Sequence, residues 1–251
     1  MRTSILLALA ASGCVAAPPI HPRARESNDR CSEYLAQGDL SNAEVQCDLG
    51  LEFSPTYADL WVNKGLIAFK RDQLELAKDH FIKAIRYNQE QAQAYNNLGI
   101  IDLRELAFEN ARGNFQRALE VNPDYREARY NLGLAYYYLG RREDAKKQFR
   151  TAVALAPEVP DAHKELGMMA LEDGDLDMAT AELQQAVERD PRLAAAWLYL
   201  GVAHAKSGRY EAAKSAFKAC LAAEPANIDC HRNAAALDRQ SLERGGTPKV
   251  P

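Results

Sequence analysis

Cysteine is the side chain with the clearest chemistry in this sequence, because a thiol can form a disulfide or bind a soft metal ion. The chain has five cysteines: Cys14, Cys31, Cys47, Cys220 and Cys230. No CxxC or HxxxH spacing occurs, whereas zinc sites need close, paired ligands. Cys230 followed by His231 is therefore a weak metal candidate, and the CxxCH motif of haem attachment is also missing.

The histidines do not indicate a catalytic site. They are spread along the chain at His21, His80, His163, His204 and His231. No HExxH, GxSxG, GxGxxG or Walker-type motif is found in the sequence. We therefore expect no enzymatic activity and no cofactor, and a packing role for His204.

Residues that recur at a fixed spacing organise the rest of the chain. Five glycines are each 34 residues from the next: Gly65, Gly99, Gly133, Gly167 and Gly201. Sixteen residues after each glycine stands a large apolar residue: Phe81, Phe115, Phe149, Leu183 and Phe217. Four of the five blocks then have a proline: Pro123, Pro157, Pro191 and Pro225. A period of this length in a sequence of helix-forming residues is typical of a helical solenoid.

Each period predicts two helices joined by a tight turn. In the last period, Gly201 and Phe217 lie on the apolar stripes of the two helices, Gly208 breaks the chain between them, and Pro225 ends the second. Glycine costs about 1 kcal/mol in a helix interior relative to alanine. Its recurrence therefore indicates that the second helix approaches the first closely at this position.

The series W-x2-L-G, A-x3-F-x2-A and P resembles the tetratricopeptide repeat over residues 58–227. Some positions depart from that pattern: Lys64 precedes Gly65, Gln89 stands where proline is expected, and Arg129 and His163 occupy the Trp/Tyr position. The blocks are residues 58–91, 92–125, 126–159, 160–193 and 194–227. The resemblance implies helix-turn-helix units stacked into a solenoid.

The repeat register extends beyond these five blocks at both ends. Counting back 34 residues from Gly65 gives Cys31, and residues 24–57 keep enough of the register to form a degenerate first repeat. After Pro225 the helical spacing continues, which predicts a capping helix at 228–243 and a tail at 244–251. The expected fold is all-α: a tetratricopeptide-repeat solenoid of six helix-turn-helix repeats plus a C-terminal capping helix.

The register also favours one pairing of four cysteines. Cys31 and Cys47 replace the glycine and the phenylalanine that meet across each hairpin. Cys220 lies on the last second helix, and Cys230 is the third residue of the expected capping helix. Of the three possible pairings, we therefore expect Cys31–Cys47 and Cys220–Cys230. Two disulfides require an oxidising compartment, which indicates export.

The start of the chain resembles a bacterial lipoprotein signal. Arg2 precedes a short apolar run, and Ala11-Ser12-Gly13-Cys14 resembles a lipobox. The resemblance implies a signal peptide at 1–13, acylation of Cys14 and a tether at 14–28. Because Val15 follows the cysteine, the sorting rule of enteric lipoproteins implies the bacterial outer membrane, facing the periplasm. The alternative is an ordinary signal peptide cut near Ala16-Ala17.

The first helices of tetratricopeptide repeats line a concave face that binds partners. The residues expected on it are Asn63, Leu66, Phe69, Asn97, Ile100, Leu103, Arg104, Tyr130, Asn131, Leu134, Tyr137 and Tyr138. Three of these are asparagines at one repeat position, where peptide-binding members of the family also have asparagine. Two alternatives remain open: the asparagines could bond only neighbouring helices, and the apolar side chains could pack on the adjacent repeat.

The overall charge excludes one class of partner. The chain has 31 Lys+Arg against 35 Asp+Glu and no basic block, so we expect no nucleic-acid binding. An outer-membrane lipoprotein of six such repeats resembles the pilotins of type IV pilus systems, which bind a secretin and promote its assembly. The resemblance implies a monomeric, non-enzymatic scaffold for a secretin or another envelope protein, in contact with the membrane only through its lipid anchor. The alternative is a general envelope scaffold for outer-membrane protein assembly or peptidoglycan synthesis.

Overall fold

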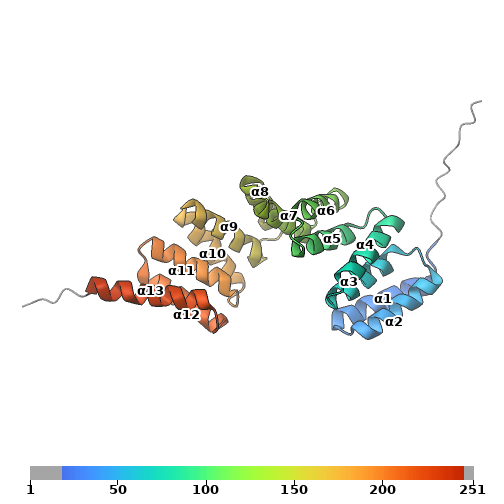
Figure 1. Ribbon diagram of the computed structural model, residues 1–251, viewed down its shortest axis with the longest axis horizontal. Coiled ribbons are helices and arrows are strands. Elements are labelled where there is room, and N and C mark those ends of the chain that lie inside the picture. The colour runs from blue at the N-terminus through green and yellow to red at the C-terminus, as the bar shows by residue number, and fades with distance from the viewer. Residues whose placement is uncertain (1–18, 246–251) are drawn as a thin grey trace, which may run out of the picture. The chain divides into compact units, whose positions relative to one another are not determined.

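The computed structural model describes residues 19–245, and within them the chain forms only α-helices and the turns that join them (Figure 1). The helices are α1 (Pro22–Gln37), α2 (Leu40–Phe53), α3 (Ala58–Lys70), α4 (Leu74–Tyr87), α5 (Ala92–Arg104), α6 (Phe108–Val121), α7 (Arg126–Tyr138), α8 (Arg142–Leu155), α9 (Pro160–Asp173), α10 (Leu176–Arg189), α11 (Ala194–Lys206), α12 (Tyr210–Ala223) and α13 (Ile228–Gly245). The predicted signal peptide and the predicted lipidation site, Cys14, lie outside the described residues. Among residues 19–245, no helix has the length and apolar character needed to cross a bilayer.

The helices pair in chain order into hairpins, and the pairs form two compact units. Helices α1–α4 belong to the unit that ends at Gln89, and α5–α13 belong to the unit that begins at Glu90. From α3 onward, the first helix of every hairpin begins at residue 58, 92, 126, 160 or 194. These are the residues at which the 34-residue blocks begin, so each block is one hairpin.

Packing inside each hairpin places a large ring against a glycine. A Cβ atom added at Gly99 would lie 2.6 Å from Cε1 of Phe115, and one added at Gly133 would lie 2.6 Å from Cε1 of Phe149. Both phenylalanines are fully buried. The recurrent glycine therefore creates the space into which the ring of the second helix inserts.

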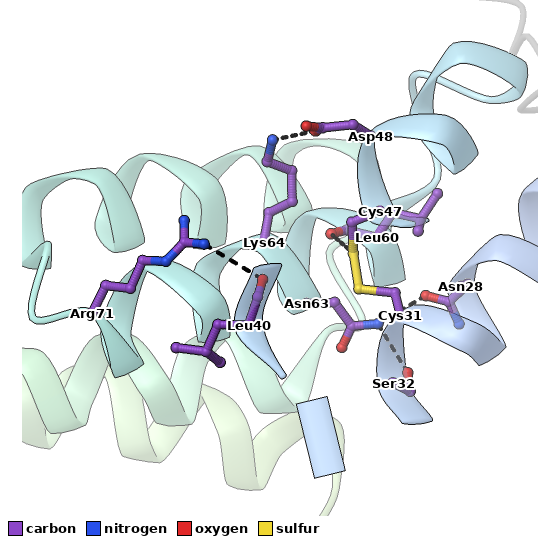
Figure 2. The surroundings of a disulfide bond; sticks show 10 residues. All are labelled: Asn28, Cys31, Ser32, Leu40, Cys47, Asp48, Leu60, Asn63, Lys64 and Arg71. Carbon is purple, nitrogen blue, oxygen red and sulfur yellow. Dashed lines mark hydrogen bonds and ion pairs between the residues drawn. A yellow bond between two sulfur atoms is a disulfide. The ribbon is translucent and has the colours of Figure 1, made fainter. Parts of the chain in front are cut away.

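In the first hairpin, a disulfide takes the place of this contact. Cys31 on α1 and Cys47 on α2 are bonded, with their Cα atoms 5.5 Å apart (Figure 2). Both cysteines are fully buried, and the sulfur of Cys47 lies 3.7 Å from the carbonyl oxygen of Leu60 on α3. The bond thus links the two helices where they pack on the next hairpin.

A second disulfide holds the other end. Cys220 on α12 and Cys230 on α13 are bonded, with Cα atoms 6.3 Å apart, and both pack against Ala194. The two pairs are the ones that the repeat register favours. Helix α13 starts at Ile228 and ends at Gly245, two residues beyond the expected end of the capping helix.

The loops before the first helices are fastened by a recurrent hydrogen bond to a proline carbonyl. In four repeats and in the capping helix, the residue at the Trp/Tyr position donates a ring or guanidinium N–H to the carbonyl of a proline six residues earlier. The pairs are Trp61 to Pro55, Arg129 to Pro123, His163 to Pro157, Trp197 to Pro191 and His231 to Pro225, at 2.6–3.1 Å. Arg129 and His163 depart from the pattern in residue type but supply the same donor.

The predicted tether is shorter than expected, because α1 begins at Pro22 rather than near residue 28. Proline suits the first position of a helix, where its missing N–H is not needed. His21 caps the helix by accepting a hydrogen bond from the Arg23 amide, and its ring stacks on Phe53 at 5.1 Å. Residues 22–28 are therefore part of the first hairpin.

Candidate functional site

Two of the predicted binding asparagines are engaged by neighbouring helices. The side-chain Nδ2 of Asn63 donates to Oδ1 of Asn28 and to Oγ of Ser32 on α1, each at 3.0 Å (Figure 2). The Nδ2 of Asn131 on α7 donates to Oδ1 of Asn96 on α5, also at 3.0 Å. Asn63 is buried. At these two positions the structure therefore favours the alternative in which the asparagines bond neighbouring helices.

The same pairing continues with other residue types. Tyr130 on α7 donates its hydroxyl to Oε1 of Glu165 on α9 at 3.3 Å, and Lys164 lies 2.8 Å from the same carboxylate. Burial and the nearby Glu165 carboxylate raise the pKa of Tyr130 well above its usual value, so the hydroxyl remains a donor. Burial opposes the charged form of Lys164, but Glu165 and Asp161 outweigh it and raise the pKa of this lysine.

Three of these hydrogen bonds, Asn63–Asn28, Asn131–Asn96 and Tyr130–Glu165, share one sequence separation that the repeat pattern does not reveal by itself. Each joins a residue to another 35 positions later, that is, to the next repeat shifted by one. The Nδ2 of Asn97, the asparagine of the intervening repeat, is buried without a hydrogen bond. A search for polar residues at this spacing would have found the ladder.

Most of the apolar side chains in the predicted partner-binding set also take part in packing. Leu66 packs against the core of the first unit, and Ile100, Leu103 and Leu134 pack against the core around Phe115 and Phe149. These side chains are half-buried, as is Phe69, whereas Lys70 and Arg104 are exposed. These apolar side chains therefore offer less surface to a partner than fully exposed side chains would.

The three consecutive tyrosines of α7 differ in exposure. Tyr136 is buried and its hydroxyl accepts a hydrogen bond from Gln116, at 3.1 Å. Tyr137 donates its hydroxyl to Glu172 of α9 at 3.2 Å. Tyr138 remains 55% exposed, with its ring stacked on Phe108 at 5.0 Å. Of the predicted aromatic centre, Tyr138 offers the largest free surface.

A cavity of about 580 Å³ lies in the second unit, next to Tyr130 and Asn131. It is formed by α5, α7, the end of α8 and the start of α9. The lining residues are Asn96, Ile100, Tyr125, Arg126, Glu127, Tyr130, Asn131, Ala152, Ala156, Glu158, Val159, Asp161 and Ala162. Three of them belong to the predicted partner-binding set: Ile100, Tyr130 and Asn131. The contributions from α8 and α9 had no signal in the repeat pattern, because they depend on how two hairpins meet.

The cavity has an apolar lining and a charged rim. Arg126 and Glu158 form an ion pair at 3.2 Å, and Asp161 lies 3.6 Å from Lys164. Glu127 adds a third carboxylate at the first turn of α7. Within the described side chains, no group of three or more His, Cys, Asp or Glu residues could hold a metal ion. The site is therefore an apolar cavity with acidic and basic side chains at its edge.

Comparison with known proteins identifies the repeat. Family models of the tetratricopeptide repeat match residues 58–91, 107–140, 130–182 and 170–237, together more than half of the chain. The chain is a tetratricopeptide-repeat protein. Proteins of this family are protein-interaction scaffolds, and the matched models describe no enzyme. No curated protein matches the chain.

Solved structures share this tetratricopeptide-repeat fold. PilF of Pseudomonas aeruginosa is 18% identical, with a TM-score of 0.79 over 85% of this chain and 97% of that chain. PilW, a widely conserved type IV pilus biogenesis factor, is 21% identical, with a TM-score of 0.73 over 84% and 98%. YrrB, a tetratricopeptide-repeat protein with an unusual peptide-binding site, is 22% identical, with a TM-score of 0.60 over 74% and 96%. At these identities the likeness concerns the fold alone.

Proposed function

We propose that this tetratricopeptide-repeat protein is a lipid-anchored scaffold of the bacterial outer membrane that promotes assembly of a type IV pilus secretin. The observation that carries the proposal is the similarity to PilF and PilW, whose chains it covers over 97% and 98% of their length. The TM-scores of 0.79 and 0.73 exceed the 0.60 of YrrB, and both matches cover more of this chain, 85% and 84% against 74%, which favours this role. Since fold alone does not determine function, two further features are needed.

The first supporting feature is the lipobox-like segment that ends at Cys14. Several acyl chains anchor a protein stably, whereas a single chain binds a membrane only marginally. The second is the pair of disulfides, since such bonds persist in oxidising compartments such as the periplasm. The disulfides favour export, and the lipobox-like segment favours both export and attachment to a membrane.

Deletion and complementation in the native host test the proposal. A strain without this protein should lose secretin multimers and surface pili, and the wild-type gene should restore both. A Cys14→Ala variant should leave the membrane fraction and restore neither, while Ser12→Ala, which keeps a small residue before the cysteine, should behave as wild type. If the deletion strain assembles secretin and pili normally, the pilus role is wrong. A loss confined to other outer-membrane proteins or to peptidoglycan would favour a general envelope scaffold.

A further inference from the structure

The cavity of the second unit is large enough to hold part of another molecule. Its volume of about 580 Å³ lies within the range of about 300–1,000 Å³ that is typical of ligand sites. Its walls are mainly apolar, and Ile100, Tyr125, Tyr130 and Val159 are the larger apolar side chains among the lining residues. Val159 is 38% exposed, so part of the apolar lining is accessible from solvent.

Small side chains keep the cavity open where two hairpins meet. Ala152 and Ala156 line it from the end of α8, and Ala162 lines it from the start of α9. Ala156 ends its helix at a position that is polar in every other repeat: Ser54, Asn88, Asn122, Asp190 and Glu224. An apolar residue at this one helix end extends the apolar lining of the cavity toward its rim.

The charges around the cavity favour a partner of one sign of charge. Three carboxylates, those of Glu127, Glu158 and Asp161, line it together with one guanidinium, that of Arg126. Arg126 is already paired with Glu158, and Lys164, beside Asp161, lies closer to Glu165. The rim is therefore net acidic. Complementary charge assists encounter with a cationic segment and disfavours an acidic one.

We propose that this cavity binds an extended client segment in which an apolar side chain enters the pocket and a neighbouring lysine or arginine contacts the acidic rim. The inference rests on the proposed scaffold function and adds the chemistry of the segment that is recognised. The apolar side chain contributes most of the affinity by displacing water from the lining. The rim charge contributes chiefly to specificity and association rate.

Synthetic peptides and the purified protein test this directly. The probe is a short peptide with blocked ends and alternating leucine and lysine at its centre. One matched peptide has glutamate in place of lysine, and another has serine in place of leucine. We expect the leucine–lysine peptide to bind at least about tenfold more tightly than either control, as measured by fluorescence anisotropy. Amide shifts in nuclear magnetic resonance spectra should cluster at Ile100, Tyr130 and Val159.

Two exposed acidic residues give a matched pair of variants. Glu127 and Glu211 both lie in the first turn of a helix, but only Glu127 lines the cavity. Glu127→Lys should weaken the leucine–lysine peptide by about threefold to tenfold, while Glu211→Lys, with the same helix-end cost, should leave it unchanged. Equal binding of all three peptides, equal effects of both variants, or shifts away from the cavity would overturn the inference.

The peptide result separates this inference from the pilus role. If the leucine–lysine peptide binds as expected but the deletion strain assembles secretin normally, the cavity is a binding site and the pilus role is wrong. If the peptide does not bind but deletion abolishes secretin multimers, the pilus role stands and the client contacts another surface.

Discussion

At the level of single residues, the contact between the two helices of a hairpin depends on a missing methyl group. At Gly99 an added Cβ would lie 2.6 Å from the ring of Phe115. At Gly113, in the middle of α6, the same atom would meet nothing within 4 Å. Both glycines are therefore helical, but Gly99 faces a buried ring and Gly113 faces open space.

We expect the two alanine substitutions to have opposite effects on stability. Gly99→Ala should destabilise the protein by about 1–3 kcal/mol, because the buried ring must shift in a close-packed core. Gly113→Ala should stabilise it by about 1 kcal/mol, since alanine favours the helix. Urea unfolding followed by circular dichroism measures both. An unchanged midpoint for Gly99→Ala would mean that the ring can move without cost.

His80 is expected to make the stability of the first unit depend on pH. Its ring lies 5.4 Å from that of Trp61, and its Nδ1 atom is buried without a hydrogen bond. Burial, and then the nearby Lys64 and Lys83, lower the pKa of His80 below its ordinary value. Between that lowered value and the unfolded value of about 6.5, the unfolded chain binds a proton that the folded chain does not.

The free energy of unfolding should therefore fall as the pH decreases below about 6.5. A His80→Phe variant keeps an aromatic ring beside Trp61 but has no titrating group. It should lose less stability than the wild-type protein between pH 7 and pH 5, as measured by urea unfolding at each pH. Because burial also lowers the pKa of His204, some dependence should remain. Parallel pH curves for the two proteins would contradict this role of His80.

The sequence predicted which residues pack inside a hairpin better than it predicted which residues are free to bind a partner. The roles of Gly99 and Phe115 follow from a local period, since both lie in one hairpin. The roles of Asn63 and Asn131 depend on which residue the adjacent hairpin places beside them, Asn28 or Asn96. A pattern defined within one repeat does not contain that information.

At the level of helices and loops, a side-chain N–H of α3, α7, α9, α11 and α13 bonds the loop before the helix. Trp197 donates to the carbonyl of Pro191 at 2.9 Å, and Arg129 donates to that of Pro123 at 2.6 Å. Gln89 stands where the corresponding proline would be before Tyr95. The loop without the proline is also where the two compact units divide.

Trp197→Phe should remove this hydrogen bond while keeping an aromatic ring in the core. Loss of one such bond should cost about 0.5–1.5 kcal/mol. Trp197→His, which restores a ring N–H as found at His163 and His231, should recover part of that loss. Thermal unfolding of the three proteins provides the measurement. If phenylalanine and histidine destabilise equally, the donor is not the reason for the residue choice.

The helix plan itself was predictable because glycine, phenylalanine and proline recur at one period. The start of α1 was not, since Pro22 reads equally well as part of an extended tether or as the first residue of a helix. Only the tertiary contacts decide between these, including the hydrogen bond from the His21 amide to Ser54 at 3.0 Å. The cavity was unpredictable for a similar reason, because it depends on how α7 and α9 are spaced.

At the scale of the whole molecule, the two disulfides lie in the first and last pairs of packed helices. Peptide mapping without reduction should find Cys31 linked to Cys47 and Cys220 linked to Cys230 in protein isolated from its native compartment. Each bond closes a short loop, which stabilises by about 2–4 kcal/mol in the chain-entropy estimate. Reduction should therefore lower the melting temperature. Free thiols at all four positions would contradict both the pairing and the proposed export.

Both disulfides join cysteines that are close in sequence, with separations of 16 and 10 residues. Within residues 19–245, no disulfide spans the repeats between Cys47 and Cys220. A gene that gained or lost one 34-residue block in that interval would keep both cysteine pairs intact, and a new repeat would need to fit only its two neighbours. The number of repeats can therefore change in evolution, and the length of the binding face can follow a client, without redesign of either end.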